Sequence, residues 1–198
     1  LGQEALFTAA DTGLWVGRPA EWPGSRPLDI EPDLGADFGR LSEWPRDQVV
    51  KVLCFCHPND DHGLWKRQIQ TVKRLFEACR RNQLEFLLEV IPSRAGEIDD
   101  MTTALVIQRF YDESIFPDWW KLEPLLTVAA WQNVIDAIER NDAHTRGVVI
   151  LGLGESEEKL ERSFSIAATY PLVKGFAVGR TIFADVAQQW FLGTKTDA

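Results

Sequence analysis

The feature that most constrains the fold is the alternation of short, β-rich apolar runs with longer segments in which apolar residues recur at helical spacing. Clear runs lie at residues 49–56, 85–92, 117–124, 147–154 and 173–180. A segment with helical periodicity follows each of them, at about 64–79, 99–111, 127–140, 156–168 and 181–191. Repeated strand–helix units predict a parallel β-sheet covered by helices, which is an α/β fold.

The number of runs leaves two architectures open. An earlier apolar segment at 14–16 is a further candidate strand. The stretch that follows it, up to residue 45, is rich in Gly and Pro and predicts a long irregular connection. The strands could form an open doubly wound sheet or most of a parallel (β/α)8 TIM-type barrel. A full barrel usually takes about 250 residues. We therefore expect one domain over 1–198 that forms a barrel without its first strand or strands.

The start of the chain supports the same expectation. Residues 1–10 begin with leucine and already follow the pattern of a helix. We therefore expect the natural domain to begin further upstream.

Composition excludes several classes of partner. The formal net charge of the 198 residues is -9, which argues against nucleic acid or an anionic membrane as the ligand. Any basic site must therefore be local.

No signal peptide is evident, and no apolar run approaches the roughly 20 residues of a membrane helix. The three cysteines are an odd number, which fits a reducing, cytoplasmic setting.

Ionisable side chains stand inside three neighbouring predicted strands. Lys51 lies in the first clear run, Glu89 in the second, and Lys121 and Glu123 in the third. Because an unpaired charge buried among apolar groups costs several kcal/mol, roughly, these side chains should point into a barrel and meet there. A cluster of two lysines with one or two carboxylates results.

Such a cluster has a structural and a chemical interpretation. It can be a buried ion network that only specifies packing. Alternatively, burial and a second ammonium disfavour the charged form of a lysine, so that Lys121, flanked by Trp119 and Trp120, becomes a neutral amine that attacks carbonyls. Glu89 or Glu123 could then carry the protons. This chemistry is that of a Schiff-base lyase.

The last run carries a candidate phosphate site. Gly179 and Arg180 open the final predicted helix, where free N–H groups and a guanidinium would bind an anion. An ordinary glycine turn with a surface arginine is the alternative. The stretch "GLGESEE" at 152–158 is not a dinucleotide fingerprint, because it lacks the third glycine and its glutamates would repel an anion.

The histidines give a weaker signal. His57 lies just past a strand end, where barrel residues reach substrate, and Asn59 and Asp60 follow it. Together with the cysteines, the histidines match no zinc-site spacing, so we expect no metal and no other cofactor.

Several stretches together resemble one family. They are "GLWVGRPAEWPGSRPL", "VVKVLCFCHPND", "FLLEVIP", "PDWWKLEP", "GVVILGLG" and "VKGFAVGRTIF", which cover nearly the whole chain. They look like the aldolase-like domain at the C-terminal end of the bifunctional inositol-catabolism protein, behind a 5-dehydro-2-deoxygluconokinase. More distantly, they resemble the class I tagatose-bisphosphate and sulfofructosephosphate aldolases, which are barrels.

The resemblance implies roles for particular residues. The Schiff-base lysine falls on Lys121, the strand lysine and the glutamate of the next strand on Lys51 and Glu89, and the phosphate-holding pair on Gly179 and Arg180. A substrate-contacting serine of the distant aldolases falls on Gly152, which is a departure. Their first strand, with its acidic residue, is expected to have no counterpart here.

The implied reaction is metal-independent cleavage of 6-phospho-5-dehydro-2-deoxygluconate to dihydroxyacetone phosphate and malonate semialdehyde. The competing class is a non-catalytic sugar-phosphate-binding or regulatory domain. In either case the expected ligand is a phosphorylated sugar or keto acid, and a fused or associated sugar kinase is an expected partner. A homo-oligomer stays open.

Overall fold

The computed structural model describes residues 6, 8–9 and 12–195, except for the side chain of Arg180. Its strands are β1 (Val16–Pro19), β2 (Gln48–Cys54), β3 (Glu85–Val90), β4 (Trp119–Leu122), β5 (Gly147–Leu151) and β6 (Val173–Ala177). These six strands form one sheet in the order β1-β2-β3-β4-β5-β6, and every neighbouring pair is parallel. The prediction of a parallel α/β sheet is confirmed.

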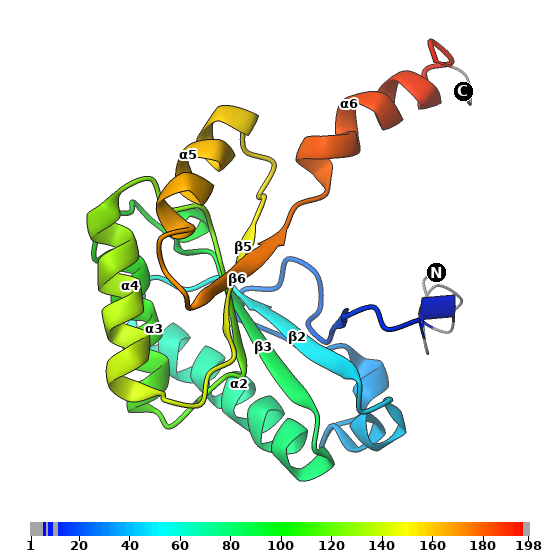
Figure 1. The fold of residues 1–198 in the computed structure, drawn as a ribbon. Coiled ribbons are helices and arrows are strands. Elements are labelled where there is room, and N and C mark those ends of the chain that lie inside the picture. The colour runs from blue at the N-terminus through cyan, green and yellow to red at the C-terminus, as the bar shows by residue number, and fades with distance from the viewer. Residues whose placement is uncertain (1–5, 7, 10–11, 196–198) are drawn as a thin grey trace.

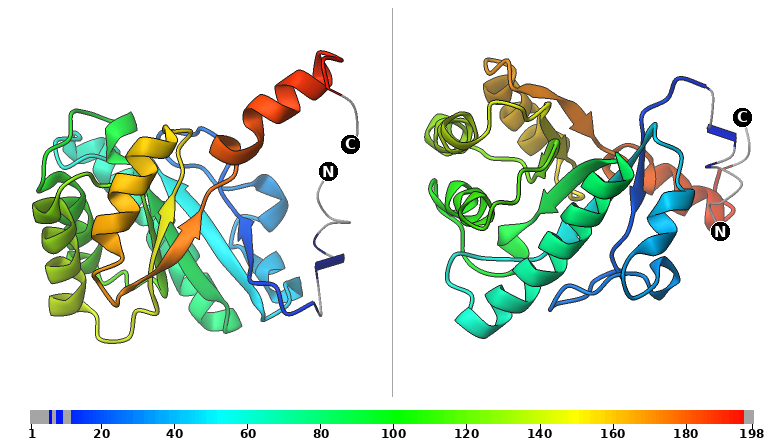
Figure 2. Two further views of the ribbon diagram at one scale, coloured as in Figure 1. Left: turned by 45° about the horizontal axis from the view of Figure 1, so that its top comes forward. Right: turned by 90° about the horizontal axis from the view of Figure 1, so that it is seen from below.

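Helices follow five of the strands. They are α2 (His62–Asn82), α3 (Thr102–Asp112), α4 (Val128–Asn141), α5 (Glu157–Ala167) and α6 (Arg180–Phe191). In Figures 1 and 2, α2 to α5 lie side by side along one side of the sheet, whereas α6 leads away from it. None of the described helices combines the length and the apolar character that crossing a bilayer would require.

The strand order decides between the two architectures. A doubly wound sheet reverses its strand order at a switch point, where its ligand binds. Here the spatial order equals the chain order throughout, so the doubly wound alternative is wrong. The six strands curl into a half-barrel, as Figure 2 shows, which is compatible with part of a TIM-like barrel.

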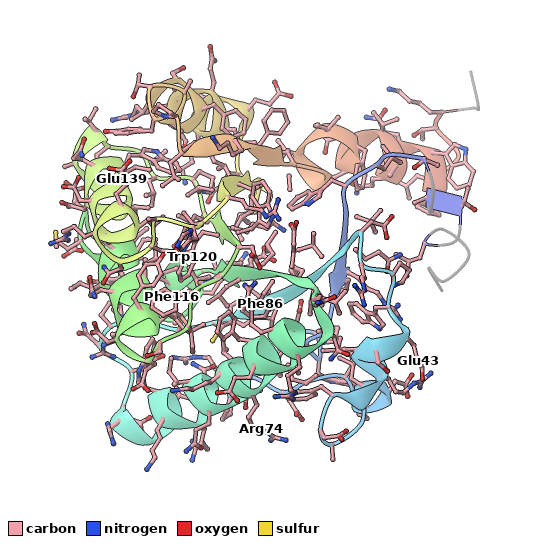
Figure 3. The ribbon with its side chains drawn as sticks, turned by 60° about the horizontal axis from the view of Figure 1, so that its bottom comes forward. Glu43, Arg74, Phe86, Phe116, Trp120 and Glu139 are labelled. Carbon is pink, nitrogen blue, oxygen red and sulfur yellow. The ribbon has the colours of Figure 1, made fainter. Side chains whose placement is uncertain are left out.

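Successive residues of each strand face opposite sides of the sheet, which separates the apolar core from the polar face. Residues at even positions of β2 to β5 pack under the helices and are fully or almost fully buried; they include Val50, Val52, Cys54, Phe86, Leu88, Val90, Trp120, Leu122, Val148 and Ile150. Figure 3 shows Phe86 and Trp120 in this layer, and Arg74 and Glu139 on the outer surface. Residues at odd positions face the inner side of the curled sheet.

The stretch predicted as an irregular connection contains more structure than expected. It includes most of β1, an isolated antiparallel bridge from Glu21 to Ile30, and two short 3-10 helices, Pro32–Leu34 and Gly39–Glu43. Apolar side chains of the stretch are buried in the core, among them Leu28, Ile30, Leu34, Phe38, Leu41 and Trp44. Of β1, only Val16 falls in the predicted strand segment 14–16. The sequence predicts the rest as a connection because "VGRP" contains the Gly and Pro that normally mark a turn. Most of the helix expected over 1–10 lies outside the described residues.

Helix caps connect the sequence to the ends of the helices. Thr127 precedes α4, and its hydroxyl accepts a hydrogen bond from the Ala130 N–H at 3.0 Å. The Ser156 hydroxyl accepts from the Lys159 N–H, so the predicted cap of α5 is confirmed. Each cap satisfies one of the N–H groups that a helix start leaves without a partner.

Thr127→Ala should lower the free energy of unfolding by about 1 kcal/mol, because an N–H group at the start of α4 loses its acceptor. The measurement is urea unfolding at constant pH. Thr71→Ala is the matched control, since Thr71 lies within α2 and its hydroxyl bonds only to the Arg67 carbonyl of the same helix. Equal losses in the two variants would contradict the capping role.

Candidate active site

A row of alternating carboxylate and ammonium groups crosses the inner face of the sheet. Lys51 Nζ lies 2.5 Å from Glu21 Oε1 and 2.8 Å from Glu89 Oε2. Lys121 Nζ lies 3.0 Å from Glu89 Oε1. Glu89 therefore bridges the two lysines, and the row runs Glu21, Lys51, Glu89, Lys121 from the β1 side to β4.

Strand register explains why these groups meet. Glu89 on β3 is the direct neighbour of Lys121 on β4, and Leu53 on β2 is the neighbour of Glu89 on its other side. Lys51 lies two residues before Leu53 and so on the same face. The structure thus brings together three of the four residues predicted as catalytic, while their catalytic roles stay predictions.

Glu21 is a site residue that the sequence analysis missed. It lies two residues after the end of β1, it is 7% exposed, and its Oε2 has no hydrogen-bond partner among the described residues. Whether Glu21 corresponds to the acidic residue of the first strand in the distant aldolases is untested, so the expectation that this strand has no counterpart here stays a prediction. The signal was available as a single glutamate after "VGRPA", but it stood in a stretch that lacked the pattern of a strand.

The electrostatics of the row keep Lys51 charged. Burial by itself lowers the pKa of Lys51, but the carboxylates of Glu89 and Glu21 outweigh burial, so the pKa of Lys51 is raised above its ordinary value. Lys51 therefore serves as a fixed positive charge between two carboxylates. Among the described residues, Lys121 pairs with one carboxylate, that of Glu89.

The two tryptophans beside Lys121 do not surround it together. Trp120 points to the opposite face, where its Nε1 donates to the Tyr111 hydroxyl at 2.9 Å. Trp119 shares the inner face with Lys121, and its ring centroid lies 5.0 Å from that of Trp15. Only one of the two tryptophans can therefore form an apolar wall on the side of Lys121, because neighbours on a strand face opposite ways.

Glu123 lies apart from the row. It follows β4, it is 3% exposed, and its Oε1 accepts a hydrogen bond from the Ser93 N–H at 3.1 Å. Burial raises its pKa above the ordinary value, and the Ser93 hydrogen bond offsets this only in part. It lines a separate cavity of about 350 Å³ with Asp99, Asp100 and Glu155.

His57 is buried, and both ring nitrogens have partners. Its Nε2 lies 2.8 Å from the Glu97 carbonyl oxygen, and its Nδ1 accepts from the Asn59 N–H at 3.1 Å. The carboxylate of Asp60 accepts a hydrogen bond from the backbone N–H of His57 and also forms an ion pair with Arg26. These contacts hold the loop after β2, and none of His57, Asn59 and Asp60 lines the cavity beside the lysines. The role of His57 in substrate binding stays a prediction.

The row borders a cavity of about 540 Å³ on the inner face. Its lining consists of Gly24, Arg26, Lys51, Leu53, Phe55, Glu89, Ile91, Arg94, Lys121, Leu151 and Leu153. Four of these residues are cations and one is an acid. The sequence analysis expected any basic site to be local, and this cavity is one place where cations gather. Arg26 and Arg94 are lining residues that the sequence analysis missed.

The carboxyl ends of β5 and β6 hold the predicted phosphate residues. Gly152 follows β5, and a Cβ there would lie 3.0 Å from Val178 Cγ1, a tight contact that the Val178 side chain would have to relieve by moving. Gly179 is the N-cap of α6, and the Thr181 hydroxyl donates to the Glu155 carbonyl at 3.1 Å. The side chain of Arg180 lies outside the described residues.

The described residues contain no group of three or more His, Cys, Asp or Glu placed to hold a metal ion.

Comparisons with known proteins agree with this fold. The model of a family described as "Uncharacterized protein conserved in bacteria (DUF2090)" matches residues 1–198. No curated protein matches the chain. Among solved structures, the chain is similar to Cgl0159 from Corynebacterium glutamicum (Brevibacterium flavum), with a TM-score of 0.56 and 19% identity. The match covers 87% of this chain and 58% of that one, so the chain spans little more than half the length of this relative. At this identity the likeness shows the fold alone.

Glu123→Gln should stabilise the protein increasingly as the pH rises. The pKa of Glu123 is raised above the ordinary 4.5, so its ionised form is disfavoured by folding. The cost is absent below 4.5, where the carboxyl is protonated in both states, and it grows as the pH rises through the folded-state pKa. The measurement is the difference in unfolding free energy between variant and wild type at several values from pH 4 to 8.

Glu139→Gln, at an exposed position of α4, is the matched control and should show little change with pH. If the advantage of Glu123→Gln is the same at every pH, the assigned burial effect is wrong.

Proposed function

We propose that this chain, which belongs to the DUF2090 family, is a class I aldolase that forms a Schiff base with its substrate through Lys121. One observation carries the proposal: Lys121 lies beside a cavity on the inner face of a curled parallel sheet, in direct contact with a carboxylate, Glu89, at 3.0 Å. An amine and a proton acceptor in contact are the two groups that imine formation requires.

In the first step, Glu89 takes a proton from the Lys121 ammonium, and the neutral amine attacks the ketone carbon of the substrate. A proton of the attacking nitrogen moves to the resulting alkoxide, which gives the neutral carbinolamine. Glu89 then returns its proton to the carbinolamine hydroxyl, which leaves as water. The charge of Lys51 holds Glu89 in position throughout, because the same carboxylate contacts both lysines. The product of this step is an iminium, whose carbon accepts an electron pair more readily than a ketone does.

In the second step, a carbon–carbon bond breaks. For 6-phospho-5-dehydro-2-deoxygluconate, a carboxylate removes the proton of the C3 hydroxyl, the C3–C4 bond breaks, and its electron pair moves into the iminium. Glu89 is the first candidate for this base, because it lines the cavity and contacts Lys121. Glu123, the second candidate from the sequence, has a raised pKa that suits proton transfer, but it lines a separate cavity. Malonate semialdehyde leaves, and protonation at C4 followed by hydrolysis releases dihydroxyacetone phosphate and the free lysine.

The phosphate would bind at the carboxyl ends of β5 and β6. The start of α6 after Gly179 offers N–H groups and the positive end of a helix dipole, and the position of Gly152 brings the β5 end close to this turn. Arg180 is assigned to the same phosphate by sequence. Phosphate sites at the last strands are typical of barrels, which fits our further proposal that the natural domain is a (β/α)8 barrel in the cytoplasm, with a sugar kinase fused or associated.

The test is reductive trapping. Incubation with dihydroxyacetone phosphate followed by borohydride should leave a stable adduct whose mass maps to the peptide containing Lys121. Lys121→Arg should abolish the adduct, because a guanidinium does not form an imine under these conditions. Lys174→Arg is the matched control and should trap like wild type. Lys174 is an exposed lysine of β6 whose ammonium donates to the Pro171 carbonyl and, among the described residues, has no carboxylate partner.

An adduct on Lys51 or Lys174 would show that the wrong lysine was chosen. Absence of any adduct would overturn the Schiff-base proposal.

A second function is favoured by one observation. Both inner-face lysines are held in ion pairs, which is what a structural network in a non-catalytic sugar-phosphate-binding domain would show. Turnover separates the two functions: an aldolase releases dihydroxyacetone phosphate from the phosphorylated keto acid, whereas a binding domain retains the ligand unchanged.

A further inference from the structure

The charges around the cavity are balanced except at one residue. Lys51 and Lys121 are neutralised by Glu21 and Glu89, and Arg26 is paired with Asp60. Arg94 lines the same cavity and is exposed, and its guanidinium has no hydrogen-bond or ion-pair partner among the described residues. Its charge reaches Glu123, whose pKa it lowers, but burial outweighs this influence. An unpaired guanidinium facing a cavity is suited to an anionic ligand.

Arg26 adds a second, fixed guanidinium to the same wall. Its Nε donates to the Phe55 carbonyl at 3.2 Å, and its terminal nitrogen contacts the carboxylate of Asp60. The Asp60 carboxylate in turn accepts a hydrogen bond from the backbone N–H of His57, at 3.0 Å. Because the Phe55 carbonyl and the Asp60 carboxylate fix the orientation of its guanidinium, Arg26 can donate its remaining N–H groups to a ligand at little entropic cost.

The strand order places these arginines away from the phosphate end. Arg94 belongs to the short helix Pro92–Arg94 after β3, and Arg26 follows β1. The turn of Gly179 follows β6. Since β4 with Lys121 lies between β3 and β6 in the sheet, anion-binding groups stand on both sides of the lysine.

From this arrangement we infer that Arg94, supported by Arg26, binds the carboxylate of an acidic aldehyde, so that the site is selective for keto-acid phosphates over neutral sugar phosphates. The identity of the ligand rests on the proposed aldolase function. In that substrate the ketone carbon carries the phosphate arm on one side and the carboxylate arm on the other. The sheet presents the same order of groups: the arginines after β1 and β3 and the lysine of β4 line the cavity, and the helix start follows β6 beyond the cavity lining.

The first experiment does not depend on catalysis. Malonate, a three-carbon dicarboxylate, is titrated into the full chain by calorimetry, with malonamide as the uncharged counterpart. Wild type should bind malonate and not malonamide, and Arg94→Gln should weaken malonate binding about 10-fold or more, as expected for loss of one charged hydrogen bond. Arg94→Lys keeps the charge without the planar fork and should lie between the two.

Arg162→Gln is the matched control, because Arg162 is an exposed arginine of α5 that lines none of the cavities described above. It should bind malonate like wild type. If wild type does not bind malonate, or if Arg94→Gln and Arg162→Gln bind it equally, the carboxylate site is refuted.

The second experiment measures selectivity in the direction of synthesis. Dihydroxyacetone phosphate is condensed with malonate semialdehyde or with propanal, which lacks the carboxylate. Arg94→Gln should lower kcat/KM for malonate semialdehyde about 10- to 100-fold and leave the value for propanal nearly unchanged. Equal losses for both aldehydes would overturn the inference.

Trapping of dihydroxyacetone phosphate at Lys121 separates this inference from the proposed function. That adduct needs no carboxylate, so it should persist in Arg94→Gln and show that the variant is folded. If wild type traps dihydroxyacetone phosphate but its malonate binding does not depend on Arg94, the aldolase proposal stands and the carboxylate site is refuted. If wild type binds malonate through Arg94 but forms no adduct with dihydroxyacetone phosphate, the carboxylate site stands and the aldolase proposal is refuted.

Discussion

The buried row of alternating charges is the interaction on which the inner face of the sheet depends. Taking an isolated carboxylate or ammonium out of water costs several kcal/mol, roughly, and only a close partner repays it. Each carboxylate in the row therefore needs the lysine beside it, and the middle pair, Lys51 and Glu89, has neighbours on both sides. Four adjacent segments of the chain are thereby fixed relative to one another at the level where the cavity opens.

The two lysines of the row are not equivalent. Lys51 lies between two carboxylates that raise its pKa, so it is a permanent charge that orients Glu89. In the described part of the chain, Lys121 pairs with Glu89 and with no second carboxylate, so the loss of its proton breaks one ion pair instead of two. The same network can thus serve packing at one end and chemistry at the other, which is why a structural and a catalytic interpretation both arise from one set of contacts.

The cavity combines this neutral row with one cation that no carboxylate pairs. Of the four cations in its lining, Lys51, Lys121 and Arg26 have carboxylate partners, whereas the Arg94 guanidinium has none among the described residues. In a protein with a net charge of -9, such an unpaired cation attracts an anion to one place on an otherwise repelling surface. A ligand with an anion at each end of a carbonyl would use the arginines after β1 and β3 and the helix start after β6 together.

The sequence by itself determined the secondary structure, because helical and strand periodicities are local properties: the predicted order of strands and helices from residue 49 onward is confirmed, with ends displaced by a few residues. It also predicted that Lys51, Glu89 and Lys121 face one side, since side chains on a strand alternate. Only the tertiary structure decided the sequential strand order, the place of Glu21 in the row and of Arg94 in the cavity lining, the opposite orientation of Trp120, and the separation of Glu123 from the row. Those features depend on how strands register with one another and where loops return, which are contacts between residues far apart in the chain and leave no periodic signal in it.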